Sequence, residues 1–125
     1  MKIPFLNLKQ VNKPFEKDFE RAYHAFIQSG WYILGEKVSA FEKEYGDFNK
    51  VRHTIGVANG LDALILSLKA LNIGAGDEVI VPSNTYIASW LAISYVGAIP
   101  IPVEPRIDTY NINPELIEAA ITSKT

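Results

Sequence analysis

The spacing of apolar residues changes near residue 50. Before that point, apolar residues recur every three or four positions, which is typical of helices with one buried face. The pattern predicts a helix over residues 14–28, closed by Gly30, and a second helix over residues 36–48. The apolar face of the second helix, which we expect to be buried, consists of Val38, Phe41 and Tyr45.

After residue 50, short apolar runs alternate with helical patterns. The runs predicted to be strands are residues 53–58, 78–81 and 99–103. The predicted helices are residues 61–71, with Leu64, Leu68 and Leu71 inside, residues 86–96, and a last helix that starts at Asn113-Pro114. This alternation predicts a parallel α/β sheet with right-handed crossovers. Because ligands of such sheets bind at the carboxyl ends of the strands, we expect the loops after residues 58 and 81 to share one edge.

Composition excludes several classes of function. The 125-residue chain has no cysteine, which rules out disulfides, thiolate metal sites and cysteine nucleophiles. Its formal net charge of −2 gives no sign of a nucleic-acid-binding surface. It has neither the pattern of a signal peptide nor an apolar stretch long enough to cross a bilayer. We therefore expect a cytoplasmic protein that binds neither nucleic acid nor membrane.

The turn Asn59-Gly60-Leu61 is the first candidate site. A strand that runs directly into a helix aims free backbone N–H groups, and the positive end of the helix dipole, at one point, which suits a phosphate. Gly60 lets an anion approach the backbone without interference from a Cβ atom. The alternative is an ordinary turn in which Asn59 or Asp62 caps the helix, and the Asn-Gly pair alone favours this alternative. The turn is neither a Walker A loop nor a G-x-G-x-x-G motif.

The segment around Tyr86 is the second candidate site. Tyr86 opens a predicted helix and could stack on a flat heteroaromatic ring, while Ser83, Asn84 or Thr85 could contact its polar groups. The alternative is that Ser83 or Thr85 caps the helix and that Tyr86 and Trp90 pack inward. Taken alone, the segment favours this alternative.

The other residues with potential chemistry are isolated. His24 and His53 have no partner at metal-ligand spacing, so we expect no metal site. No pair of carboxylates suggests general acid–base catalysis. The loop with Glu104 and Asp108 has the composition of a surface turn.

Four segments together resemble a known family. They are residues 35–45 (GEKVSAFEKEY), 55–64 (IGVANGLDAL), 76–82 (GDEVIVP) and 109–114 (TYNINP). In this combination they resemble the DegT/DnrJ/EryC1/StrS family of pyridoxal-phosphate-dependent aminotransferases, which act on nucleotide-linked keto sugars. The turn at Asn59, with Trp31-Tyr32 and Glu104-Pro105, is similar to the branch that aminates C3 of dTDP-3-keto-6-deoxyhexoses.

The resemblance implies a fold, a cofactor and partners. The implied fold is α/β, the N-terminal part of the fold type I large domain, over residues 1–125, with a helical segment 1–50 and a βαβαβα portion 51–125. The backbone of Gly60 and Leu61 would bind the phosphate of pyridoxal 5'-phosphate, and Tyr86 would lie over its pyridine ring. The side chains of Trp31 and Tyr32 would lie near the sugar and the dimer interface. The implied partners are a nucleotide-linked keto sugar, glutamate as amino donor, and a second copy in a homodimer.

The same resemblance places the covalent chemistry outside this sequence. The Schiff-base lysine, the acidic partner of the pyridine nitrogen and a polar residue beside the ring are all implied beyond Thr125. Neither Lys69, on a predicted exposed helix face, nor Lys124 replaces that lysine. We therefore expect the chain to be a truncated N-terminal portion without transaminase activity.

Other interpretations stay open. The chain could be a non-catalytic fragment or a partner-binding module of the family. The intact enzyme could instead be a sugar dehydratase or isomerase on the same scaffold. A generic phosphate-binding α/β domain is a more distant alternative.

Overall fold

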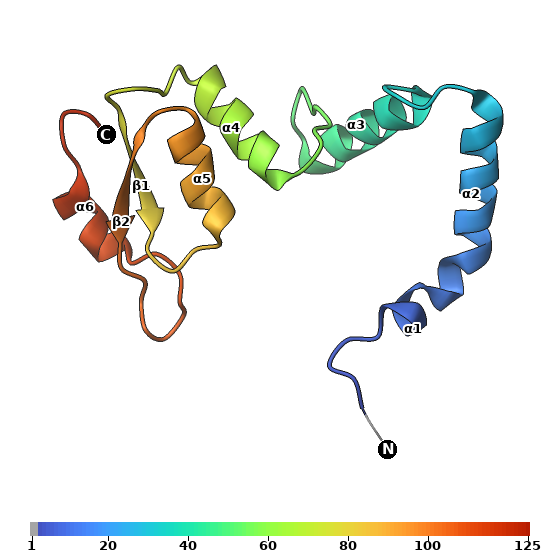
Figure 1. Cartoon of the computed structure of the whole chain (residues 1–125), viewed down its shortest axis with the longest axis horizontal. Helices are drawn as coiled ribbons and strands as arrows, with labels where there is room; N and C mark the ends of the chain where they lie inside the picture. Colours follow the sequence, from blue (N-terminus) through green and yellow to red (C-terminus); the bar gives the residue numbers. More distant parts are fainter. Residues whose placement is uncertain (1–2) are drawn as a thin grey trace. The chain divides into compact units, whose positions relative to one another are not determined.

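The computed structural model describes residues 3–125, which fall into two compact units. The first unit ends at Gly56 and the second spans Val57–Thr125. In Figure 1 the first runs from blue to green and the second from light green to red.

The first unit is helical. Its elements are α1 (Leu8–Asn12), the 3-10 turn η1 (Lys13–Phe15), α2 (Glu16–Ser29) and α3 (Glu36–Asn49). α2 and α3 confirm the two helices that the spacing of apolar residues predicted over residues 14–28 and 36–48. α2 ends at Gly30, whose left-handed backbone (φ 64°) suits glycine at the end of a helix.

The expectation of a buried face on α3 is wrong. The Phe41 and Tyr45 rings stack with centroids 5.5 Å apart, but they are 58% and 50% exposed. Val38 is only partly buried, and Gly46 is the one buried residue among the described residues of this unit. The spacing of apolar residues shows which face of a helix is suited to burial, but no element of this unit packs over that face of α3.

The strand predicted over residues 53–58 does not form. These residues have no regular secondary structure and pair with no strand among residues 3–125. This part of the chain bonds to α3 instead: the Gly56 N–H donates to Oε1 of Glu42 (2.7 Å), and the N–H of Val51, two residues before the predicted strand, donates to the Gly46 carbonyl (3.0 Å). A β-strand forms only where its backbone pairs with a neighbouring strand. A run of apolar residues in the sequence does not show whether such a neighbour is present.

The second unit is built on a two-stranded parallel sheet. Its elements are α4 (Gly60–Ala70), β1 (Glu78–Pro82), α5 (Ile87–Tyr95), β2 (Ile99–Val103), the 3-10 turn η2 (Pro114–Leu116) and α6 (Ile117–Ala120). β1 and β2 pair in parallel, with Glu78 opposite Ile99, and α5 forms the crossover. Figure 1 shows α5 and α6 on opposite sides of the strands. This arrangement confirms the α/β class.

A small core lies between the sheet and α5. Its buried cluster is Val81, Ile93 and Ala98, and Leu68, Ile73, Val79, Trp90 and Val96 pack against it. Leu68 thus lies inward as predicted. Leu71 and Leu64 do not, because they are 70% and 43% exposed and the contacts of α4 with other elements are chiefly those with α5.

Two prolines define the outer edge of β2. The Ile99 N–H donates to the Asp77 carbonyl (2.9 Å), and the Val103 carbonyl accepts from the Ser83 N–H (2.9 Å). The backbone groups of successive strand residues point to opposite sides of the strand, so those of Pro100 and Pro102 point away from β1. As proline, neither residue has an N–H group. This edge therefore lacks two of the donors that a further strand would need.

Candidate functional site

The N-terminus of α4 has the form expected of an anion site. Asn59 is the N-cap, in extended conformation (φ −162°, ψ 175°), and its Oδ1 accepts from the Asp62 N–H (2.9 Å). The Asn59 carbonyl accepts from the Ala63 N–H (3.1 Å). Within residues 3–125, nothing accepts from the N–H of Gly60 or Leu61. The capping interpretation of Asn59 is therefore correct, and two donors remain free beside the cap.

The space in front of this turn is open. No atom lies within 4 Å of the position that a Cβ atom on Gly60 would take. The free N–H groups of Gly60 and Leu61, at the positive end of an 11-residue helix, thus lie next to open space.

Tyr86 lies at the start of α5 and faces outward. It is the N-cap of the helix, its carbonyl accepts from the Ser89 N–H (3.0 Å), and the residue is 79% exposed. The alternative in which Tyr86 and Trp90 pack inward is therefore wrong for Tyr86, whereas Trp90 is half-buried against the core. The cap by Ser83 or Thr85 that belonged to this alternative is also absent, since the Thr85 hydroxyl bonds to the Ser89 hydroxyl (3.0 Å).

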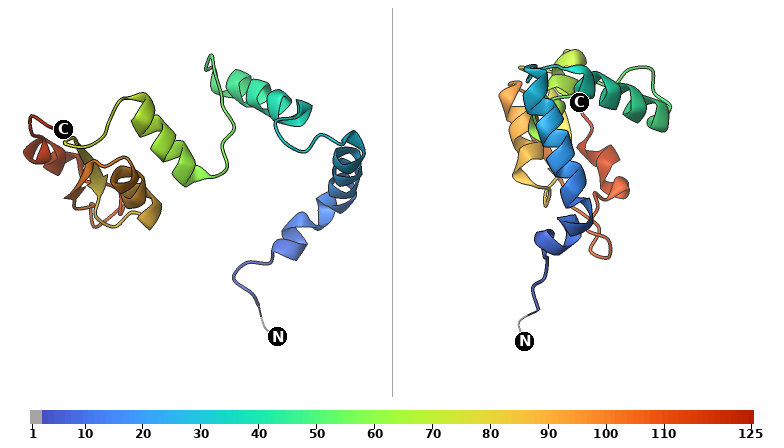
Figure 2. Two further views of the ribbon diagram at one scale, coloured as in Figure 1. Left: turned by 45° about the horizontal axis from the view of Figure 1, so that its top comes forward. Right: turned by 90° about the vertical axis from the view of Figure 1, so that its right-hand side faces the viewer.

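Gly60, Leu61 and Tyr86 lie at one end of the second unit. α4 packs against α5, and both views show the two helices running in the same general direction (Figures 1 and 2). The first residues of both helices therefore lie at the end of the unit where β1 terminates. The start of α4, with its two free N–H groups, and the start of α5, with the exposed Tyr86, thus lie at the same end of this unit.

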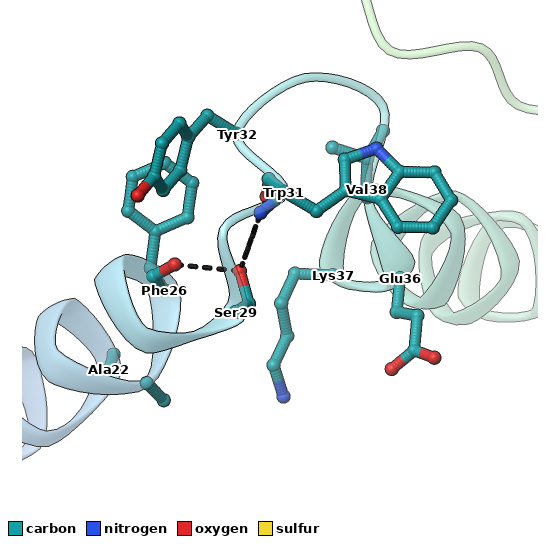
Figure 3. A pocket seen from close by; sticks show the side chains of 10 residues that line it. Ala22, Phe26, Ser29, Trp31, Tyr32, Glu36, Lys37 and Val38 are labelled. Atoms are coloured by element: carbon teal, nitrogen blue, oxygen red, sulfur yellow. Dashed lines mark hydrogen bonds between the residues drawn. The ribbon is translucent and has the colours of Figure 1, made fainter.

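Trp31 and Tyr32 belong to the other unit, in the loop between α2 and α3. They line a cavity of about 530 Å³ together with Ala22, Ala25, Phe26, Ser29, Gly35, Glu36, Lys37 and Val38. Figure 3 shows the Tyr32 ring beside Phe26 and the Trp31 indole beside the first turn of α3. The Phe26 and Tyr32 ring centroids are 5.0 Å apart.

The polar atoms of both aromatic residues are used within the loop. The Tyr32 hydroxyl donates to the Ile27 carbonyl at the end of α2 (3.1 Å). The Trp31 indole N–H donates to the Ile33 carbonyl (2.6 Å). Ser29 closes the loop, because its hydroxyl donates to the Phe26 carbonyl (2.7 Å) and accepts from the Trp31 N–H (3.1 Å). Ring faces, rather than polar tips, are thus what this loop offers to a ligand.

Ser29 and Asn84 are contributors that the sequence did not single out in these roles. Ser29 is the hub of the α2–α3 loop, and Asn84 donates from its side-chain amide to the Tyr110 carbonyl (3.0 Å). A Ser two residues before an aromatic residue is a usable local signal for the first. A bond that spans 26 residues has no such local signal.

Residues 3–125 hold no group of three or more His, Asp or Glu side chains placed to share a metal ion. No helix over the same residues combines the length and hydropathy needed to span a membrane.

Comparison with known proteins identifies the family. Residues 14–125 match the model of the DegT/DnrJ/EryC1/StrS aminotransferase family. The chain therefore belongs to this family. It is 56% identical, over 98% of its length, to the dTDP-3-amino-3,6-dideoxy-alpha-D-galactopyranose transaminase of Aneurinibacillus thermoaerophilus, of which it covers 34%.

Solved structures agree with this assignment. Over 99% of the chain, a crystal structure of Streptomyces venezuelae DesV superposes with a TM-score of 0.95 at 47% identity, and 33% of that chain is covered. NtdA of Bacillus subtilis, crystallised with the cofactor PMP, superposes with a TM-score of 0.94 at 32% identity, with 29% of it covered. The chain thus spans about a third of the length of these relatives.

Proposed function

We propose that this chain is the N-terminal part of a pyridoxal-phosphate-dependent aminotransferase that acts on a nucleotide-linked keto sugar. The observation that carries the proposal is the pair of free N–H groups at Gly60 and Leu61 on the same end of the unit as the exposed Tyr86 ring. Family membership and the names of the relatives support it.

The residues present fit the cofactor. The open turn at Gly60 suits a phosphate, and the outward ring of Tyr86 suits a flat pyridine. When bound, pyridoxal 5'-phosphate supplies an electron sink and carries the amino group. In this proposal, Gly60 and Leu61 hold its phosphate by backbone donors, and Tyr86 fixes the plane of its ring.

The proposed partners follow from the same family membership. We propose a dTDP-3-keto-6-deoxyhexose as acceptor and glutamate as amino donor, supported by the name of the Aneurinibacillus thermoaerophilus relative. Trp31 and Tyr32 would contact the sugar substrate by their ring faces, since their polar atoms are used within the loop. We further propose a cytoplasmic homodimer, in which residues 1–125 belong to one cofactor-binding large domain.

The covalent step needs a lysine that we place beyond residue 125. Lys69 lies exposed on α4, nine residues after Gly60, and Lys124 lies in the segment that bonds to the start of β1. The intact mass of the protein purified from its source tests this point. A mass above 13.9 kDa, with amino transfer from glutamate to the keto sugar, supports the proposal. A mass of 13.9 kDa with such activity contradicts the placement of the lysine.

Cofactor binding by the 125-residue chain is a sharper test. Pyridoxamine 5'-phosphate is the probe, because it is fluorescent and cannot condense with surface lysines, and pyridoxamine without phosphate is the comparison. Gly60→Pro removes one N–H at the first position of α4, where proline is tolerated, and the extended Asn59 before it suits a following proline.

We expect Gly60→Pro to weaken binding of the phosphorylated probe about tenfold to a hundredfold, because a hydrogen bond to a charged group contributes roughly 1.5–3 kcal/mol. Glu36→Pro, at the first position of α3, is the matched control and should leave binding unchanged. Equal affinity for pyridoxamine with and without phosphate would reject the proposed role of the turn.

A further inference from the structure

Two loops at the proposed cofactor end of the second unit are bonded to each other. One is the turn from Pro82 to Tyr86, and the other is the loop over residues 104–113 that follows β2. The Asn84 side-chain amide donates to the Tyr110 carbonyl across 26 residues (3.0 Å). Asn84 is exposed, so no burial requirement explains this bond.

The loop over residues 104–113 is held in a definite shape. The Tyr110 N–H donates to the Arg106 carbonyl (2.8 Å), and the Arg106 N–H donates to the Asn111 carbonyl (2.8 Å). Pro105 and Ile112 form an antiparallel bridge at its base. The turn from Pro82 is thus bonded to a braced loop rather than to a loose one.

Tyr110 is strained within this loop. Its φ of 58° lies in the left-handed region, which a residue with a large side chain adopts only where its surroundings enforce it. Its N–H is bonded inside the loop, and its carbonyl accepts from Asn84 outside it. Asn84 therefore fixes the same residue that the loop strains.

The same turn sets the direction of Tyr86. Its ring is too exposed for packing to orient it, so the backbone that leads into α5 must do so. That backbone closes through the Thr85 N–H on the Pro82 carbonyl (3.3 Å), with Asn84 in the middle of the turn. A contact that anchors Asn84 to a braced loop reduces the freedom of the turn, and hence of the ring two residues later.

We propose that Asn84 is a positioning residue for the Tyr86 ring. Its amide fastens the turn to the loop over residues 104–113, and so presents the ring ready to stack on a flat heteroaromatic ligand. This inference rests on the proposed function, in which that ligand is the pyridine ring of the cofactor.

The test uses the 125-residue chain with two probes, pyridoxamine 5'-phosphate and inorganic phosphate. Asn84→Leu keeps the approximate shape of the side chain and adds no charge, but it removes the amide that donates to the Tyr110 carbonyl. We expect it to weaken binding of pyridoxamine 5'-phosphate about threefold to tenfold, the range of an aromatic stacking contact, and to leave phosphate binding unchanged. Asn49→Leu is the matched control, because Asn49 donates in the same way to the Tyr45 carbonyl (2.8 Å), inside α3. It should change neither affinity.

Tyr86→Ala separates the inference from the proposed function. If Tyr86→Ala weakens binding of pyridoxamine 5'-phosphate and Asn84→Leu does not, the positioning role is overturned and the stacking role stands. If Asn84→Leu weakens binding of both probes equally, its role is structural only, and the inference is again overturned. If the Tyr86→Ala variant binds pyridoxamine 5'-phosphate as well as the unmodified chain does, the stacking proposal fails and the positioning role fails with it.

Discussion

The two units differ in burial although both follow the predicted helical spacing. In the first unit, Gly46 is the only buried residue described, and aromatic residues of η1 and α2 such as Phe15, Phe19 and Tyr23 are more than half exposed. In the second, Val81, Ala92, Ile93, Ala98 and Val103 are 6% exposed or less. Amphipathic spacing therefore predicts where a helix forms, but a core requires a second element to pack against.

The largest expected effect comes from comparing the substitution of one core residue with that of one exposed aromatic residue. Ile93→Ala should lower the free energy of unfolding of the second unit by about 3 kcal/mol, because it leaves a cavity under the sheet. Phe41→Ala on α3 should change unfolding by less than about 0.5 kcal/mol, as surface substitutions do. Urea titrations followed by circular dichroism measure both. Equal losses of unfolding free energy in the two variants would mean that the first unit has a core, contrary to the exposure of its side chains.

Glycines of the same conformation sharpen the comparison. Gly97, after α5, has φ 84°, and alanine there should cost the second unit about 1–2 kcal/mol of unfolding free energy. Gly30, after α2, has φ 64°, and Gly30→Ala carries the same backbone strain in a unit without a core. We expect amide hydrogen exchange to report a loss across the second unit for Gly97→Ala, but only near the α2–α3 loop for Gly30→Ala. A first unit that lost protection as a whole would contradict the contrast.

The N-cap of α4 gives a smaller effect. Asn59→Ala removes the acceptor of the Asp62 N–H and should cost about 1 kcal/mol, whereas Asn59→Ser should restore most of it. α3 has no side-chain cap, so no equivalent loss is available in that helix. Thermal unfolding of the two variants measures the cost. Equal midpoints for the alanine and serine variants would show that the cap does not stabilise the helix.

The smallest effect concerns an exposed ion pair on α3. The hydrogen bond and charge of Asp47 raise the pKa of Lys43 above its ordinary value. A raised lysine pKa favours folding while the amine is charged, so this contribution is complete below about pH 10.5 and is lost as the pH rises further. The helix content of the chain should fall slightly over that alkaline range, and less so in Lys43→Met. Identical alkaline curves for the two would show that the pair adds nothing.

Much of the second unit was predictable because its signals are local. The proline that ends β1, the glycine after α5 and the Asn113 cap each fix a boundary through backbone geometry. The two strands and their parallel pairing follow from the alternation of elements. The strand expected over residues 53–58 could not be verified from spacing, because pairing depends on which residues lie beside it.

The candidate site was predictable to a similar extent. The cap of Asn59 and the free donors of Gly60 and Leu61 follow from the geometry of a helix start. The outward direction of the Tyr86 ring does not follow from local geometry, because its helical spacing with Trp90 favoured inward packing. The Asn84–Tyr110 bond was beyond reach, since it depends on two loops meeting in space.

The prolines of β2 determine on which side a further strand can be added to the sheet. Pro100 and Pro102 leave the outer edge of β2 without two donors, so two copies of the chain cannot join by pairing these edges. Across β1, the Glu78 N–H is taken by the Lys124 carbonyl (2.8 Å), but the N–H and carbonyl of Ile80 also face that side. Any strand that enlarges this sheet, from whichever polypeptide it comes, must therefore be added beside β1.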